Sequence, residues 1–279
     1  MGTIDRYKKT RSLPGGLKIR KVLEEYIKLK LQSQPLLLMT HTVVGYPSLE
    51  DNWRMLECMH EAGIALVELQ MPFSEPIADG PVFVRANQVA LQQGMNRARY
   101  FEFMARAARE FKFPLLYMGY YNPVFRLGHA AFCRSLKAAG GRGYIIADLP
   151  PEQAIELDVM AGEMGLDPIH LMTPTNSEAR LREIAQNASG FVYCVARKGV
   201  TGRKTELGQD VIDYLERCRR LTSLPVGLGF GISTVDDLAM LKGYADIAII
   251  GTACLDVWEK QGKTAYLEYL SLMQMAAAN

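Results

Sequence analysis

The sequence predicts an α/β fold, a (β/α)8 TIM barrel with one extra helix at its N-terminal end. Short apolar runs alternate eight times with amphipathic stretches, and parallel strands need such helical crossovers between them. The length of 279 residues suits one barrel, since such barrels typically have about 250 residues. No Pro-, Gly- or Ser-rich linker divides the alternating part. Eight alternations in one undivided stretch favour a closed barrel over an open sheet.

The expected elements follow from hydrophobic periodicity along the chain. Strands are expected at residues 36–41, 65–69, 114–118, 143–147, 168–171, 190–195, 225–228 and 246–250. Amphipathic stretches lie around residues 50–62, 98–111, 128–139, 151–164, 177–186, 209–221, 234–242 and 261–276. The longest interval between strands, from Leu69 to Pro114, holds a Pro-rich loop and two helical stretches. Long inserted loops in compact domains are typically functional, so this interval is a candidate location for a site.

Residues 1–16 are expected to be a flexible basic arm, and residues 17–279 a single barrel domain. The arm is polar and ends in Pro14-Gly15-Gly16. In residues 17–31, apolar side chains recur every three or four positions, which predicts a helix with one apolar face. Because this helix precedes the first strand, we expect it to cover the bottom of the barrel. The first 31 residues carry nine Lys or Arg against three Asp or Glu, which leaves the rest mildly acidic.

Composition argues against several classes of function. The formal net charge is only +2, which is not typical of a nucleic-acid or membrane-surface protein. The apolar runs have the length of strands, and the N-terminus is too polar for a secretory signal. Five scattered cysteines without a Cys-x-x-Cys pair predict reduced thiols, with neither disulfides nor zinc. We therefore expect a cytoplasmic protein that holds no metal and binds neither nucleic acid nor membrane.

The stretch from residue 66 to residue 81 contains the strongest candidates for chemistry. An apolar run reaches Glu68, where an ionisable side chain interrupts a buried strand. Pro72, Pro76 and the turn around Asp79 make the following segment a rigid loop. A carboxylate at the carboxyl end of a barrel strand is typical of catalysis, but taken alone Glu68 fits a structural ion pair equally well. Asp79 is the weaker candidate on spacing, because Asp-Gly-Pro is also ordinary turn chemistry.

Three glycine-bearing segments follow the last three expected strands. Gly199-Val200-Thr201-Gly202 follows the sixth, Gly229-Phe230-Gly231 the seventh and Gly251-Thr252 the eighth. Glycine lets backbone N–H groups approach an anion closely, and a helix N-terminus adds the positive end of its dipole. Any one of these segments alone fits a simple turn. Together they predict a phosphate site, because barrels commonly bind phosphate after strands seven and eight.

The chain also carries a series of short motifs in a characteristic order. They are Val67-Glu68-Leu69, Pro72-Phe73-Ser74, Pro76, Ala78-Asp79-Gly80-Pro81, Tyr120-Tyr121-Asn122-Pro123, Ala147-Asp148-Leu149-Pro150, Pro174-Thr175, Gly199-Val200-Thr201-Gly202 and Gly229-Phe230-Gly231-Ile232-Ser233. In this order they resemble the signatures of the tryptophan synthase alpha chain family, over about residues 36–258. The resemblance implies a lyase that cleaves indole-3-glycerol phosphate to indole and glyceraldehyde 3-phosphate. It also implies that indole passes to a beta chain, which uses pyridoxal phosphate, in a heterotetramer of two alpha and two beta chains. The alpha chain would need no cofactor of its own.

The resemblance assigns a role to each candidate residue. Glu68 would be the general acid and base at the ring carbon and the substrate hydroxyl, and Asp79 would bind the indole N–H. Four residues are expected to contact the substrate: His41, Tyr120, Tyr193 and Thr201. Four are expected to bind its phosphate: Gly202, Gly231, Gly251 and Thr252. The segment 199–202 is expected to be a mobile lid that orders the site and excludes water.

Several positions depart from the family pattern, namely His41, Tyr46, Gln70, Met71, Glu75 and Thr252. Gln70 replaces a small residue, so a larger amide is expected near the barrel mouth. Tyr46 and Glu75 stand where the family has residues that face the beta chain, which puts the partner contacts in doubt. His41 stands where an aromatic residue lines the indole pocket. A lone histidine at a strand end more often packs than carries a proton, so we expect His41 to pack against the substrate.

Two other functions are compatible with the sequence. One is a catalytically weak regulatory barrel that binds a phosphorylated ligand and activates a beta-type partner, which the altered interface positions suggest. The other is a phosphosugar isomerase on a similar barrel, which would share the phosphate site. The isomerase gives no reason for the Pro-rich loop at residues 72–76.

Overall fold

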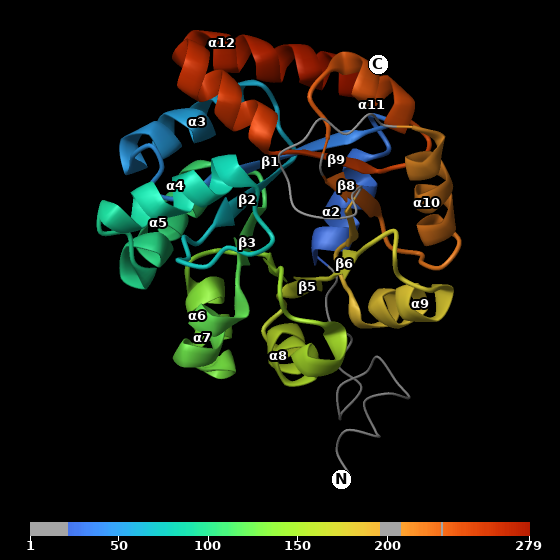
Figure 1. Cartoon of the computed structure of the whole chain (residues 1–279), viewed down its shortest axis with the longest axis horizontal. Coiled ribbons are helices and arrows are strands. Elements are labelled where there is room, and N and C mark those ends of the chain that lie inside the picture. Colours follow the sequence, from blue (N-terminus) through green and yellow to red (C-terminus); the bar gives the residue numbers. More distant parts are fainter. Residues whose placement is uncertain (1–21, 196–207, 230) are drawn as a thin grey trace.

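The computed structural model describes residues 22–195, 208–229 and 231–279, which form a ring of parallel strands surrounded by helices (Figure 1). The strands are β1 (Leu37–Val43), β2 (Leu66–Gln70), β3 (Leu115–Gly119), β4 (Gly143–Ile146), β5 (Asp167–Ile169), β6 (Leu171–Met172), β7 (Val192–Val195), β8 (Val226–Gly229) and β9 (Ile247–Ile250). The helices are α2 (Val22–Lys30), α3 (Leu49–Glu61), α4 (Pro81–Gln92), α5 (Arg97–Glu110), α6 (Tyr121–Leu127), α7 (His129–Ala138), α8 (Pro151–Glu163), α9 (Glu178–Asn187), α10 (Gln209–Arg219), α11 (Val235–Leu241) and α12 (Thr252–Ala278). The alternation of strands and helices that the sequence predicts is confirmed.

The strands pair in the order β5-β4-β3-β2-β1-β9-β8-β7-β6, and every pairing is parallel. The two outermost members of this sheet, β5 and β6, are consecutive in the chain and are separated by His170 alone. The ring therefore closes through a single residue, and the predicted barrel is confirmed. The single strand expected at 168–171 is divided there, and the His170 ring bonds Asp158 on α8 at 2.8 Å.

Two helical segments differ from the expectation. The short helix α6 was not predicted; it begins where the Tyr121 N–H donates to the Asp148 carboxylate and ends at Gly128, whose φ is +85°. The amphipathic stretch expected around residues 261–276 is the second part of α12, which already begins at Thr252. Gly262, the residue of non-helical conformation inside α12, lies between the two parts.

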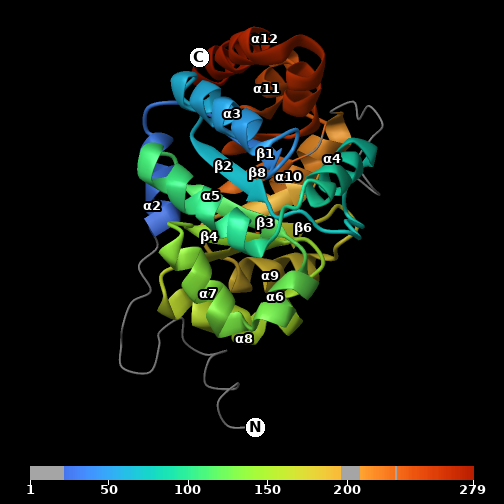
Figure 2. The same ribbon diagram turned by 90° about the vertical axis from the view of Figure 1, so that its left-hand side faces the viewer.

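The inside of the barrel is apolar and α2 closes one end of it. Leu23 and Ile27 of α2 form a buried cluster with inward-facing residues of seven strands. The Tyr26 hydroxyl donates to the Ala65 carbonyl, just before β2 begins. Figure 2 shows α2 at the end of the barrel opposite α4. The expected N-terminal cover helix is confirmed for residues 22–30. Residues 1–16 lie outside the described residues, so their division from the barrel as a flexible arm stays a prediction.

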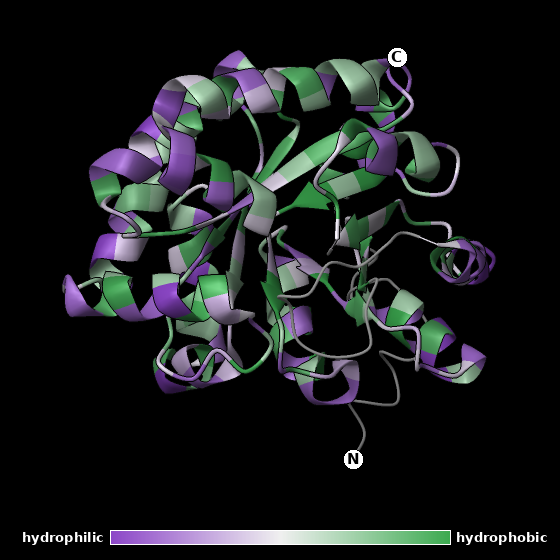
Figure 3. Ribbon diagram, turned by 45° about the horizontal axis from the view of Figure 1, so that its top comes forward, coloured by the Kyte–Doolittle hydropathy of each residue, from purple (hydrophilic) through white to green (hydrophobic). Residues whose placement is uncertain are grey.

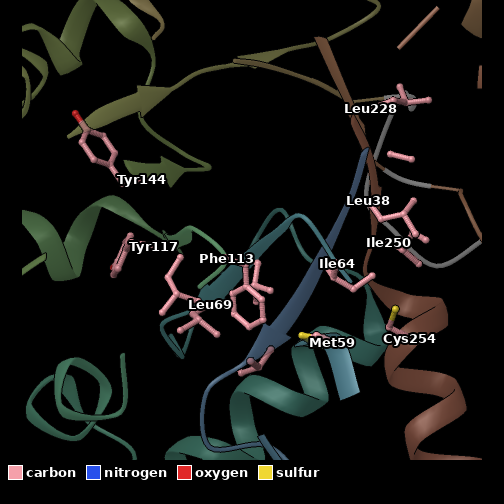
Figure 4. Packing of buried hydrophobic residues seen from close by; sticks show 14 of the residues in the cluster. Leu38, Met59, Ile64, Leu69, Phe113, Tyr117, Tyr144, Leu228, Ile250 and Cys254 are labelled. Atoms are coloured by element: carbon pink, nitrogen blue, oxygen red, sulfur yellow. The ribbon is translucent and has the colours of Figure 1, made fainter. Parts of the chain in front are cut away.

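A second and larger core lies between the strands and the surrounding helices (Figure 4). It includes Leu38 and Leu69 from the strands and Met59 and Cys254 from the helices. All five cysteines are free and buried. Apolar residues are concentrated in the central strands, and polar residues on the outer helices (Figure 3). A search of the described residues finds no helix whose length and apolar character would let it cross a membrane.

Strand register determines which side chains meet at the carboxyl end of the barrel, opposite α2. His41 of β1 is paired with Glu68 of β2. On the neighbouring side of β1, Gly229 of β8 is paired with Ile249 of β9. The segments that follow these two strand pairs therefore emerge next to each other, with β1 between β2 and β9.

Candidate active site

The first predicted acid, Glu68, is in direct contact with His41. The two residues are register partners on adjacent strands, so their side chains leave the sheet on the same face. His41 Nδ1 and Glu68 Oε1 form a short hydrogen bond. Only 1% of Glu68 and 9% of His41 is exposed to solvent. Within the described part of the chain, the other carboxylate oxygen of Glu68, Oε2, is buried and has no hydrogen-bond partner.

Gln70 connects this pair to the second predicted acid, Asp79. Gln70 is two residues after Glu68 on β2, so the two side chains lie on the same face of the strand. Its Oε1 is 2.7 Å from His41 Nε2, and its Nε2 donates to Asp79 Oδ2 at 2.7 Å. The structure thus brings both acids into one hydrogen-bonded chain that runs from Glu68 through His41 and Gln70 to Asp79. We call these four residues the acid side of the site.

Burial and mutual attraction set the protonation of the acid side. Burial raises the pKa of Asp79, although the hydrogen bond from Gln70 and the nearby His41 oppose this shift. Burial alone lowers the pKa of His41. The charge of Glu68 and the hydrogen bond to it, followed by the charge of Asp79, outweigh burial and raise the pKa of His41 overall. Asp79 and His41 therefore retain protons to a higher pH than isolated side chains of these types would.

Asn87, which the sequence analysis did not identify, holds the loop that carries Asp79. Its Oδ1 accepts the Phe73 N–H at 2.9 Å, while its Nδ2 donates to the Phe83 carbonyl at 2.8 Å and to Asp79 Oδ2 at 3.3 Å. Asn87 is fully buried on the apolar face of α4, together with Phe83, Ala86 and Ala90. A single amide within an apolar helical stripe was the signal in the sequence that could have identified it.

Tyr120 supports the same loop from the end of β3. Its ring stacks on Phe73 with a centroid distance of 5.3 Å, and its hydroxyl accepts the Ala78 N–H at 3.2 Å. Burial and then the charge of Asp79 raise the pKa of the Tyr120 hydroxyl. The structure therefore gives Tyr120 contacts that position Asp79, and the substrate contact expected of it stays a prediction.

Tyr193 lies on β7 and belongs to the cluster inside the barrel. Burial raises its pKa, and the charges of Glu68 and Asp79 raise it further, so the Tyr193 hydroxyl lies within electrostatic range of both acids. Gly229 on β8 makes room for this ring, since a Cβ at Gly229 would lie 2.3 Å from the Tyr193 hydroxyl. The glycine is therefore required by a close side-chain approach from the neighbouring strand.

The predicted phosphate residues that the structure describes are Gly231, Gly251 and Thr252, which we call the glycine side. Gly229 and Ile249 are paired on adjacent strands. Gly231 lies two residues after Gly229, and Gly251 lies two residues after Ile249, so the segments that carry them are neighbours. Gly231 has a φ of +87°, a conformation that favours glycine. Gly251 precedes the first residue of α12, Thr252, and no side chain caps this helix N-terminus. Two further predicted residues, Thr201 and Gly202, and the expected lid at 199–202 lie outside the described residues.

Phe83 joins the two sides of the site. Its ring centroid is 4.5 Å from that of His41. A Cβ at Gly251 would lie 3.2 Å from Phe83 Cζ and 3.7 Å from His41 Cβ. The acid side and the glycine side therefore meet at His41. In the described ranges, no group of three or more His, Cys, Asp or Glu is arranged to hold a metal ion.

Comparison with known proteins identifies the family. The family model described as "Tryptophan synthase alpha chain" matches residues 26–278. The chain belongs to the tryptophan synthase alpha chain family. Among the curated members, that of Desulforapulum autotrophicum is 46% identical over 241 residues, covering 86% of this chain and 95% of its own length. That of Syntrophotalea carbinolica is 43% identical over 244 residues, covering 88% and 96%.

Solved structures of tryptophan synthase share the fold. A chain of Mycobacterium tuberculosis tryptophan synthase superposes with a TM-score of 0.86 at 28% identity, over 92% of this chain and 98% of that one. A chain of the Pyrococcus furiosus tryptophan synthase α2β2 complex gives a TM-score of 0.80 at 28% identity, over 86% and 98%. The predicted family and fold are both confirmed.

The departures from the tryptophan synthase alpha pattern fall into two groups. His41 and Gln70 are part of the acid side. Tyr46 instead contacts its own chain, because its hydroxyl donates to Glu259 at 2.7 Å, and Glu259 also pairs with Arg85. Glu75 is exposed on the loop between β2 and α4. The changes near the acids therefore alter the hydrogen bonding of the site itself, which the sequence analysis did not anticipate.

Proposed function

We propose that this chain cleaves indole-3-glycerol phosphate to indole and glyceraldehyde 3-phosphate, as the alpha-type lyase of its family. The observation that carries the proposal is the hydrogen-bonded chain between Glu68 and Asp79 at the carboxyl end of the barrel. Two linked carboxylates suit a reaction that protonates a ring carbon and deprotonates a hydroxyl. The family to which the chain belongs supplies the substrate class.

Each acid has a part in the retro-aldol step. Glu68 gives a proton to the indole ring carbon that bears the side chain. Asp79 accepts a hydrogen bond from the ring N–H and so stabilises the positive charge that develops on that nitrogen. The carbon–carbon bond then breaks and its electrons return to the ring. The hydroxyl proton passes to Glu68 as the aldehyde forms. Glu68 is suited to both transfers, because its carboxylate is buried and is not fully paired among the described residues.

The glycine side is suited to bind the substrate phosphate. Gly251 and Thr252 form the start of α12, where unpaired N–H groups and the helix dipole attract an anion. Gly231 presents its backbone from the adjacent segment. Tyr193, inside the barrel, and His41, next to Phe83, are assigned to contact the indole ring. We assign Thr201 and Gly202 to the substrate and phosphate ends, respectively, on the family pattern.

We further propose that the chain works with a tryptophan synthase beta chain in an α2β2 heterotetramer, and that pyridoxal phosphate belongs to that partner. The P. furiosus relative is described as such a complex. Two large apolar side chains are exposed, Ile77 by 70% on the loop that carries Asp79 and Phe125 by 67% on α6. Apolar side chains exposed to this extent suit a protein–protein contact. Buried, free thiols suit a reducing compartment, and we place the chain in the cytoplasm.

Turnover of indole-3-glycerol phosphate tests the proposal, with the chain alone and with a beta-type chain. We expect Glu68→Gln to lower kcat by about 10³-fold with little change in KM, because the amide keeps the shape but cannot transfer the proton. Glu57→Gln, which alters a surface ion pair with Lys263, should retain activity. Equal turnover by the wild type and Glu68→Gln would refute the role of Glu68. Activation of the beta chain without any cleavage would favour the regulatory barrel instead.

A further inference from the structure

The amide of Gln70 directs its nitrogen to Asp79 and its oxygen to His41. Asn87 Oδ1 accepts the Phe73 N–H, so its Nδ2 must be the atom that faces Asp79 Oδ2. Gln70 Nε2 donates to the same oxygen. Asp79 Oδ2 therefore accepts two N–H groups. Because the amide nitrogen of Gln70 is directed to Asp79, its oxygen must face His41.

This orientation determines which nitrogen of His41 carries a proton. Gln70 Oε1 can only accept a hydrogen bond, so His41 Nε2 must donate and must be protonated. The other ring nitrogen, Nδ1, faces Glu68 Oε1. A hydrogen bond between Nδ1 and Oε1 needs one further proton. This proton belongs to Glu68 when His41 is neutral, and to Nδ1 when His41 is charged and Glu68 is ionised. The contact between Glu68 and His41 is a place where one exchangeable proton is held.

We propose that His41 and Gln70 are positioning residues that store one proton at the Glu68–His41 contact for the cleavage reaction. The inference rests on the proposed function. Glu68 delivers the stored proton to the indole ring carbon, which leaves Glu68 ionised and His41 neutral. When the carbon–carbon bond breaks, the substrate hydroxyl returns one proton to Glu68. One proton leaves and one returns, so the contact is restored after each turnover and no other reactant is needed.

The surroundings of His41 favour retention of this proton. The charged groups that face its ring are Glu68 on β2 and Asp79 on the loop after β2, and both attract a cation. Phe83 on α4 covers the ring, and Gly251, before α12, lies beside its Cβ. Tyr193 on β7 is neutral, because burial and the charges of both acids raise its pKa. Burial lowers the pKa of His41, but the charge of Glu68 and the hydrogen bond to it outweigh burial, so the stored proton is lost at a higher pH than from an isolated histidine.

The protonation of His41 can be read without substrate. In the full chain labelled with ¹⁵N-histidine, His41 can be assigned among the four histidines by the signal that His41→Phe removes. We expect Nε2 to carry a proton over the whole pH range in which the chain is folded, and Nδ1 to show the shift of a shared proton. In Gln70→Met, which removes the acceptor, Nε2 should lose this fixed protonation. A wild-type His41 protonated only at Nδ1 would overturn the inference.

The pH profile of cleavage supplies the second test. With the beta-type partner present, His41→Phe should move the alkaline limb of kcat to lower pH and lower kcat about tenfold at pH 8, with KM within about twofold. His170→Phe is the matched control, because His170 is similarly buried but bonds Asp158 on the outer side of the barrel. His170→Phe should leave the alkaline limb of kcat at the same pH as in the wild type. An equal loss for His41→Phe at every pH would mean a merely structural role and would overturn the inference.

The two tests separate the inference from the proposed function. If the wild type cleaves no indole-3-glycerol phosphate, the proposed function fails, whereas the ¹⁵N signals still decide the protonation of His41. If the wild type cleaves and the alkaline limb does not depend on His41, the inference fails and the proposed function stands.

Discussion

The acid side and the glycine side of the site lie next to each other but are built from different parts of the chain. The acid side consists of side chains. Three consecutive hydrogen bonds join them, from Glu68 through His41 and Gln70 to Asp79. The glycine side offers backbone groups at Gly231 and at the start of α12. One side depends on residue identity and protonation, whereas the other depends on backbone conformation.

This difference predicts which kinetic constant each side controls. Replacing a side chain on the acid side changes charge or proton transfer, which are felt in the transition state and therefore in kcat. Replacing a glycine changes how closely the backbone approaches a phosphate that does not react, which is felt in substrate binding and therefore in KM. Substitutions on the two sides should thus have separable effects.

After Glu68→Gln, the largest effect that distinguishes the two sides is expected for Asp79→Asn. The amide oxygen can still accept the N–H groups of Gln70 and Asn87, so the hydrogen-bond geometry is kept while the negative charge is lost. We expect kcat for indole-3-glycerol phosphate cleavage to fall by roughly 10²-fold, because charge on the indole nitrogen is no longer stabilised. Glu75→Gln removes an exposed carboxylate from the same loop and is the control. An equal loss in both variants would show that the loop, and not Asp79, is responsible.

A smaller effect, on KM instead of kcat, is expected for Gly231→Ala. Gly231 has a φ of +87°, so alanine is strained there by about 1 kcal/mol and displaces the backbone. We expect KM to rise about tenfold with kcat nearly unchanged. Gly243 has a φ of +85° and precedes β9, at the opposite end of the barrel. Gly243→Ala should cost similar stability and leave KM unchanged, and a rise in KM for both variants would contradict a phosphate role for Gly231.

Much of the architecture could be predicted from the sequence because it depends on local patterns. Eight apolar runs separated by helical periodicity were enough to predict the barrel. The helix α6 was missed because it has only seven residues and depends on Asp148, which is distant in sequence. The division of the fifth strand at His170 was missed because it results from closure of the ring, a property of the whole sheet.

The candidate site could be predicted only as far as single positions allow. Glu68 and Asp79 were identified as acids, but the connection between them depends on the register that places His41 beside Glu68. That His41 packs against substrate stays a prediction, and the structure adds that both of its ring nitrogens are hydrogen-bonded. That Glu68 and Gln70 share a strand face was predictable from their spacing of two residues. The hydrogen bond from Gln70 to Asp79 was not predictable, because it depends on the conformation of the loop that carries Asp79.

The smallest effect that separates the two sides concerns stability. Burial raises the pKa of Asp79 above its ordinary value of 3.8. Burial lowers the pKa of His41, but Glu68 and Asp79 outweigh burial and raise this pKa above its ordinary value of 6.5. The folded chain then holds protons that the unfolded chain releases. This contribution is complete below the unfolded pKa of each group and is lost as the pH rises through the folded pKa.

The free energy of unfolding should therefore decrease less with rising pH in variants that lack these groups. Urea unfolding measures this free energy at each pH. As the pH rises above 4, we expect the free energy of unfolding of Asp79→Asn to decrease less than that of the wild type. For His41→Phe we expect the same difference above pH 6.5. The sign of each difference follows from the raised pKa of that group in the folded chain. The glycine side carries no titratable group, so Gly231→Ala should follow the wild-type slope at a lower stability. Parallel curves for all four proteins would show that the acid side does not hold its protons more tightly when folded.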